Sequence, residues 1–90
     1  MLPNMSSDND LRRAREHIDV ADRRIIDALE ERMDVVVKEV KPLKEGQDPH
    51  DEARVEEVLE TRVSMGAKLS SAFVRELFRL IIKESERLQK

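Results

Sequence analysis

The stretch 10–41 contains neither glycine nor proline, and this feature most limits how the chain can fold. Within it, one set of positions recurs at alternating steps of four and three residues: Ala14, Ile18, Ala21, Ile25, Ala28, Arg32 and Val35. Such spacing is typical of one face of an amphipathic α-helix. The sequence therefore predicts a single long helix whose apolar face includes one arginine.

The ends of this helix are predicted from residues that start or stop helices. Asp8, Asn9 and Asp10 are candidate N-caps, and residues 1–9 are expected to form a flexible tail. Pro42 lacks an amide hydrogen and disfavours helix in the residue before it. The helix is therefore expected to end or kink at Pro42.

A second helix is expected after the loop 44–51, which is rich in turn residues. It would begin after Asp51, or after Asp48, and end near Met65 with Gly66 as its C-cap. No segment alternates apolar and polar residues as a half-buried strand does. The predicted fold class is therefore all-α.

The third helix would begin at Ser70 or Ser71 and run almost to the end of the chain. Its stripe consists of Val74, Leu77, Phe78, Ile81, Ile82, Ser85, Leu88 and Gln89. Residues 10–90 are thus predicted to form a single domain of three helices.

The first helix is too long to be covered by the other two. About 30 residues make a rod of roughly 45–50 Å, whereas a compact chain of this size has a radius of gyration of about 12 Å. The economical partner for the apolar face is a second copy of the chain. We therefore expect an intertwined helical homodimer. The alternative is a monomer with a broken first helix, although nothing before Pro42 would break it.

The composition argues against several classes of protein. There is no cysteine, and the two histidines, His17 and His50, lie far apart in the sequence, so no metal site is expected. A net charge of −3 with both signs interspersed argues against a nucleic-acid partner. Neither a signal peptide nor a membrane-spanning stretch is visible. We expect a cytoplasmic protein.

Polar residues interrupt the apolar stripes. Arg32 lies on the first-helix face, Arg15 stands at its other end, and Ser85 and Gln89 continue the third-helix stripe. A buried guanidinium is costly unless it is paired. Each arginine taken alone fits a nearby carboxylate partner or a stem lying along apolar surface. The alternative is a polar pocket in which arginines bind the carboxylates of an anion. Spacing alone leaves both interpretations open.

Three segments resemble, in order, the motifs of the AroQ-class, all-α chorismate mutases. "AREHIDVADRRIIDALEERMDVV" is similar to the first motif, R-x-x-I-D-x-x-D-x-x-I-(I/L)-x-L-(I/L)-x-x-R, with an alanine in place of one leucine. "DPHDEARVEEVL" resembles the second, in which a proline and an aspartate precede an arginine at a helix start. "VRELFRLIIKESERLQ" resembles the third, F-x-x-(I/L)-I-x-x-S-x-x-x-Q. The resemblance covers about Leu11 to Gln89.

This resemblance implies a homodimer with two active sites buried among its helices. It also implies the conversion of chorismate to prephenate, a unimolecular Claisen rearrangement of aromatic amino acid biosynthesis that needs no metal or cofactor. An enzyme for this reaction holds a flexible dianion in a folded conformation. It also stabilises the charge that grows on the ether oxygen as the C–O bond breaks.

The resemblance assigns a role to each matching polar residue. Arg32 would hold a substrate carboxylate within its own subunit, while Arg15 would complete the site of the partner. Arg54 would join these cations, and Ser85 would hydrogen bond the substrate. Gln89 would donate its amide to the ether oxygen.

The family lysine stands eleven residues after the position of Arg32, where this chain has Leu43. Eleven helical steps return to within about 20° of the same face, whereas twelve steps reach about 120°. We expect Lys44 to be the second donor to the ether oxygen. For that, the extra residue in "VVVKEV" would form a π-type bulge, or the last turn would unwind. Lys41 is the alternative.

Val55 follows Arg54 directly, where the family usually has a glutamate that binds the ring hydroxyl. Asp51 would shape the loop against that hydroxyl. Isochorismate-pyruvate lyases, which can carry Arg-Val here, and aminodeoxychorismate mutases share the fold, and both remain alternatives. Ser85 and Gln89 favour the mutase over the lyase. A non-enzymatic helical dimerisation module is a further alternative, and the sequence does not say whether a partner enzyme activates the protein.

Overall fold

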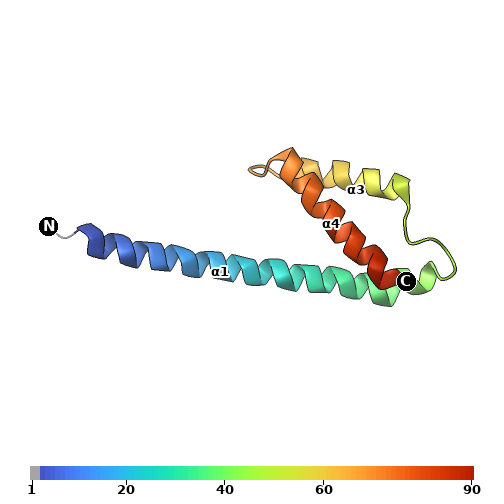
Figure 1. Ribbon diagram of the computed structural model, residues 1–90, viewed down its shortest axis with the longest axis horizontal. Helices are drawn as coiled ribbons and strands as arrows, with labels where there is room; N and C mark the ends of the chain where they lie inside the picture. Colours follow the sequence, from blue (N-terminus) through green and yellow to red (C-terminus); the bar gives the residue numbers. More distant parts are fainter. Residues whose placement is uncertain (1–2) are drawn as a thin grey trace. The chain divides into compact units, whose positions relative to one another are not determined.

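The structure, a computed structural model, describes residues 3–90, with side chains from residue 8 onward. The helical elements are α1 (Pro3–Val35), the π-helix η1 (Val36–Val40), α2 (Lys41–Leu43), α3 (Glu52–Met65) and α4 (Ser71–Gln89), as Figure 1 shows. The described residues contain no strand. The predicted all-α fold with a long first helix and two shorter ones is confirmed. Two compact units, Met1–Arg32 and Met33–Lys90, are described separately below.

The first helix starts earlier than expected. α1 begins at Pro3, so Asp8 and Asp10 lie inside the helix, and the prediction that they cap it is wrong. The physical reason is that proline suits the first helical position, where its missing N–H has no acceptor in the helix. The expected flexible tail falls partly on Met1 and Leu2, which lie outside the described residues, and it stays a prediction.

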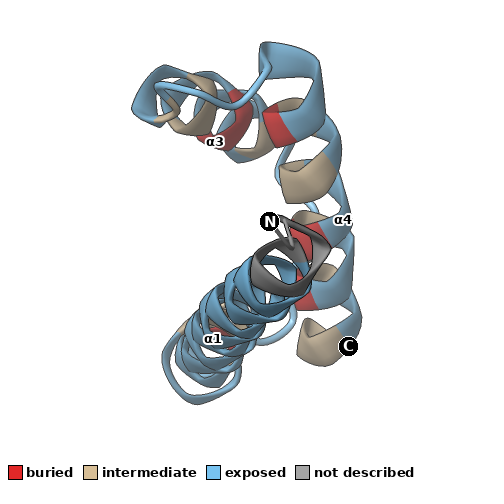
Figure 2. Ribbon diagram, turned by 90° about the vertical axis from the view of Figure 1, so that its left-hand side faces the viewer, coloured by how far each residue is buried: buried red, intermediate tan, exposed pale blue. Residues whose placement is uncertain are grey.

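The apolar face of α1 is open to solvent in the single chain. Ile18 and Ile25 are 57% and 56% exposed. Every residue from 8 to 28 is exposed, and Figure 2 shows α1 in the colour of exposed residues along most of its length. Helices in water depend mainly on burying such a face for their stability. The first unit therefore leaves an apolar face exposed in the single chain.

A π-helical turn follows α1. The amide of Lys41 donates to the carbonyl of Val36, five residues back instead of the four of an α-helix. Such a turn takes up one extra residue without ending the helix. The predicted π-type bulge in "VVVKEV" is confirmed.

The helix passes Pro42 and ends one residue later, at Leu43. The π-turn ends at Val40, two residues before Pro42, whose nitrogen has no hydrogen to give to the preceding turn. The amide of Lys44 closes the end by donating to the carbonyls of Val40, at 3.0 Å, and Lys41, at 3.2 Å. The expected stop at Pro42 is thus displaced by one residue.

α3 and α4 form a helical hairpin (Figure 1). Asp51 caps α3 by accepting the amide of Arg54 at 3.2 Å, and Ser70 caps α4 by accepting the amide of Phe73 at 3.2 Å. These predicted starts, and the end of α3 before Gly66, are confirmed. The buried apolar residues of the second unit are Val36, Val58, Leu59, Val74 and Ile81.

The C-terminal half of α4 packs against η1, so the second unit has a small core of its own. Leu59 is only 1% exposed and is its most deeply buried large side chain. Within residues 3–90, no helix combines the length and the apolar character that crossing a bilayer requires.

Candidate functional site

A half-open cavity of about 380 Å³ lies beside the end of α4 and the loop that follows α2. Its lining consists of Val37, Lys41, Pro42, Lys44, Glu45, Gly46, Gln47, Gln89 and Lys90. Two residues that the sequence predicts as donors to one substrate oxygen, Lys44 and Gln89, therefore line one cavity. The alternative lysine, Lys41, lines it as well.

Both donors make local hydrogen bonds. The half-buried Lys44 donates its Nζ to the carbonyl of Pro49 at 3.2 Å. Gln89 donates its Nε2 to the carbonyl of Ser85, one turn back, at 3.2 Å. Its Oε1 is buried and has no hydrogen-bond partner among the described residues, which is uncommon for a buried polar atom. The amide of Gln89 is thus only partly satisfied by its own chain.

Ser85 is buried in the packing of α4 and does not line this cavity. Its hydroxyl donates to the carbonyl of Ile81 at 2.9 Å and lies 3.5 Å from the sulfur of Met33. This pattern is the common back-bond of a serine to the preceding helical turn.

The start of α3 places its polar residues at the surface. The Asp51 carboxylate is occupied as the N-cap of the helix. The Arg54 side chain is 54% exposed and forms an ion pair with Glu57, one turn further along. In the single chain, these two residues therefore serve the helix itself.

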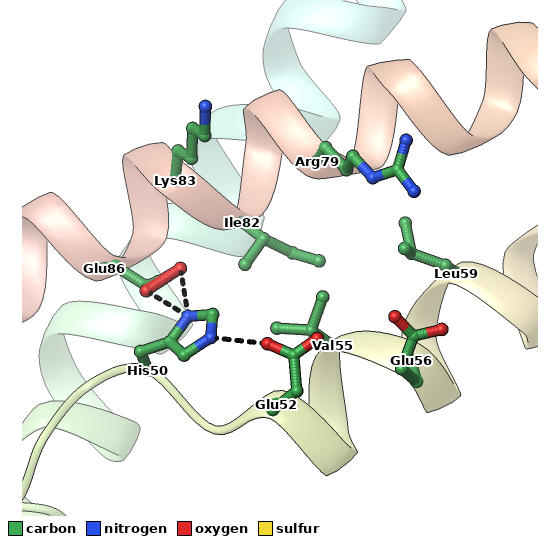
Figure 3. A pocket seen from close by; sticks show the side chains of 9 residues that line it. All are labelled: His50, Glu52, Val55, Glu56, Leu59, Arg79, Ile82, Lys83 and Glu86. Carbon is green, nitrogen blue, oxygen red and sulfur yellow. Dashed lines mark hydrogen bonds and ion pairs between the residues drawn. The ribbon is translucent and has the colours of Figure 1, made fainter.

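Val55 lines a second cavity of about 420 Å³ between α3 and α4, shown in Figure 3. Leu59 and Ile82 provide apolar lining beside it. The polar lining consists of His50, Glu52, Glu56, Arg79, Lys83 and Glu86.

His50 bridges two carboxylates in this second cavity. Its Nδ1 lies 2.9 Å from the nearer oxygen of Glu86, and its Nε2 lies 2.8 Å from Glu52 (Figure 3). The hydrogen bond to Glu52, followed by that to Glu86, raises the pKa of His50 above its ordinary value. No group of side chains within residues 8–90 is arranged to hold a metal ion.

Arg15 and Arg32 belong to the first unit, on α1. Arg15 is exposed and forms no ion pair with the described residues, whereas Arg32 is half-buried near the end of the helix. Arg15 thus lies in the first half of α1, and Arg32 lies in its last turn.

Sequence reasoning missed the cluster around His50. His50 follows a proline in a loop, and Glu86 stands 36 residues later on α4. No spacing rule links a loop residue to a particular turn of a later helix. One available signal was the position of His50 directly before the helix cap Asp51, which fixes the ring near the start of α3.

Comparison with known families gives one match. The model of the family described as "Chorismate mutase type II" matches residues 14–90. No curated protein and no solved structure matched the chain.

Replacing Asp51 with alanine should lower the free energy of unfolding by about 1 kcal/mol, because the amide of Arg54 loses its acceptor. Asp51→Asn keeps an acceptor at the cap and is the matched control, expected to lie within about 0.5 kcal/mol of the native chain. Urea denaturation followed by circular dichroism, at one protein concentration, measures both. Unchanged stability of Asp51→Ala would contradict the capping role.

Proposed function

Because the chain belongs to the chorismate mutase type II family, we propose that it is an active isomerase that converts chorismate to prephenate, acting in aromatic amino acid biosynthesis in the cytoplasm. The observation that carries this proposal is the cavity lined by both Lys44 and Gln89. Its volume falls in the usual range for small-molecule pockets, about 300–1,000 Å³. Chorismate is a small dianion that such a pocket can accommodate.

The reaction asks for orientation and for charge stabilisation, not for a nucleophile. One C–O bond breaks and one C–C bond forms within the same molecule, and negative charge grows on the ether oxygen in between. The Lys44 ammonium and the Gln89 amide would donate hydrogen bonds to that oxygen, and such donors are worth most in a site that excludes water. They would exchange the carbonyls of Pro49 and Ser85 for the substrate.

The π-turn supports Lys44 as the family lysine. Twelve residues that include one π-turn advance about as far around the helix axis as eleven residues of α-helix. Lys44 would therefore stand on the face that the eleventh position after Arg32 occupies in a regular helix. By the same count, Lys41, nine residues after Arg32, would stand at about the eighth helical position, roughly 80° from that face, so Lys44 matches the family position better.

The two carboxylates of the substrate need cations. We propose that Arg32 of the same subunit, Arg15 of the second subunit and Arg54 supply them as planar, bidentate groups. Arg54 would first leave Glu57, and an exposed pair of this kind is worth only about 0–1 kcal/mol. The free energy lost when Arg54 leaves Glu57 would therefore be offset by an ion pair with a substrate carboxylate in a less hydrated site.

A homodimer follows from the same reasoning. The exposed face of α1, with Ile18 and Ile25, gains about 1.5–3 kcal/mol for each large apolar side chain that a partner buries. A second copy of α1 offers a matching face by symmetry. Such pairing would also bring Arg15 of one chain to the site of the other.

Asp51 and Ser85 take supporting roles in this proposal. Asp51 would keep capping α3 while it shapes the loop near the ring hydroxyl. Ser85 would turn its hydroxyl from the carbonyl of Ile81 to the substrate. Of the two, only the Ser85 hydroxyl would have to change its hydrogen-bond partner.

A second candidate substrate is favoured by one observation. Val55 stands where a hydrogen-bond acceptor for the ring hydroxyl is usual, and it lies beside the apolar Leu59 and Ile82. Isochorismate-pyruvate lyases can carry an arginine followed by a valine here, so isochorismate is the second candidate. Aminodeoxychorismate, the substrate of related mutases with the same fold, is a third candidate. A non-enzymatic dimerisation module would turn over none of the three.

Incubating the purified protein separately with the three compounds and identifying the products tests the proposal. Prephenate from chorismate is the expected result. Arg32→Ala should lose roughly 10²–10³-fold in kcat/KM, about 3–4 kcal/mol, because a charged contact to the transition state disappears. Arg87→Ala is the control, since this exposed arginine pairs with Glu84 at the surface. Salicylate and pyruvate from isochorismate without prephenate would contradict the proposal, and so would turnover of no compound.

The assignment of the lysine has its own test. Lys44→Ala should lose at least about 10²-fold in kcat, because one of two donors to the ether oxygen is removed. Lys41 lines the same cavity, so Lys41→Ala is the matched comparison. Its turnover should stay close to that of the native protein. Steady-state rates of prephenate formation decide between them. The reverse pattern would show that Lys41 is the donor.

A further inference from the structure

His50 joins the two helices of the hairpin at the end opposite the connection 66–70. It stands directly before α3, and its Nδ1 reaches Glu86 on α4 at 2.9 Å (Figure 3). Its Nε2 reaches Glu52, in the first turn of α3, at 2.8 Å. One side chain thus contacts carboxylates on two different helices.

The loop before α3 is folded so that it presents this ring. Gly46 takes a positive φ of 81°, which an L side chain rarely adopts, and this allows the sharp turn. Asp48 accepts the amide of His50 at 2.9 Å, forming a local turn. The turn at Gly46 and the hydrogen bond from the amide of His50 to Asp48 therefore place the ring beside the start of α3.

The two carboxylates differ in how they are exposed. The Glu86 side chain is only 19% exposed, whereas that of Glu52 is 72% exposed and that of His50 is 47% exposed. A carboxylate withdrawn from water needs a charged or hydrogen-bonding partner. The hydrogen bond between His50 and Glu86 therefore ties the loop to α4. The hydrogen bond to Glu52 holds the other ring nitrogen against the first turn of α3.

The tie lies next to proposed site residues on both sides. His50 precedes the cap Asp51, and Arg54 follows within the first turn of α3. Glu86 lies between Ser85 and Gln89 on α4. A bond between His50 and Glu86 therefore sets where the start of α3 lies along the end of α4.

We propose that His50 is a positioning residue for the proposed reaction: by bridging Glu86 and Glu52 it holds the start of α3, with Arg54, in register with Gln89. This inference rests on the proposed function. In the proposed reaction, His50 does not contact the substrate and acts only by positioning Arg54 relative to Gln89.

The charge of the ring controls the strength of this tie. A neutral imidazole has one N–H, so only the imidazolium donates to both carboxylates. The charged groups around the ring are Asp48 in its own loop, Glu52 and Glu56 on α3, and Arg79, Lys83 and Glu86 on α4. The hydrogen bonds to Glu52 and Glu86 outweigh the effect of desolvation and raise the pKa of His50. The tie is therefore complete below that pKa and weakens as the pH rises through it.

The test measures kcat and KM for chorismate across this pH range in the native protein, His50→Gln and Glu86→Gln. The native KM should rise several-fold as the pH increases through the pKa of His50, with a smaller change in kcat. Both variants should show the raised KM already at low pH and lose this step. Glu52→Gln is the matched control. This substitution removes the hydrogen bond that does not reach α4. The rise of KM with pH should therefore persist in Glu52→Gln, but at a lower pH than in the native protein.

Proton NMR titration gives a readout that does not depend on turnover. The histidine signal that disappears in His50→Gln reports the ring, and its pKa should fall in Glu86→Gln and in Glu52→Gln. An unchanged pKa, or a KM step that survives in His50→Gln, would overturn the inference while leaving the proposed function intact. Absence of any turnover would overturn the proposed function, and this inference with it, even if the NMR titration shows the tie.

Discussion

The apolar face of α1, which stays in water in the single chain, is the constraint on which the proposed assembly and site depend. α1 exposes Ile18 and Ile25 by more than half, and no residue from 8 to 28 is buried in the single chain. Burial of apolar side chains is the main favourable term in folding and association. A second copy of the chain would supply that burial and, in the same step, bring a second arginine to each proposed site.

In the single chain, several residues of the proposed site form hydrogen bonds or ion pairs with their own neighbours. Lys44 and Gln89 line one cavity but donate to backbone carbonyls, and Arg54 pairs with an exposed glutamate. Each of these bonds is weak enough for a dianion in a drier environment to replace it. Binding would thus exchange several modest contacts for a few charge-assisted ones that hold the substrate in its reactive conformation.

Most of the helices could be predicted from rules that act within a few residues, and what these rules missed has a physical reason. Caps at Asp51 and Ser70 and the π-turn before Pro42 follow from backbone hydrogen bonding within a few residues, so the sequence predicts them. The start of α1 was missed because proline also suits the first turn of a helix. The contact of His50 with Glu86 was missed because it depends on how α3 and α4 pack, which no periodicity contains. Family motifs name candidate site residues, and of these the structure brings Lys44 and Gln89 to one cavity.

The central claim is that each active site uses residues of two chains, and a mixed dimer tests it most directly. Arg15→Ala and Arg32→Ala should each be nearly inactive alone. If the two variants are unfolded together and refolded, half of the dimers are mixed, and in each mixed dimer one of the two sites regains both arginines. The mixture should therefore show about a quarter of the native activity per chain. Activity no greater than that of the separate variants would contradict a site shared between two chains.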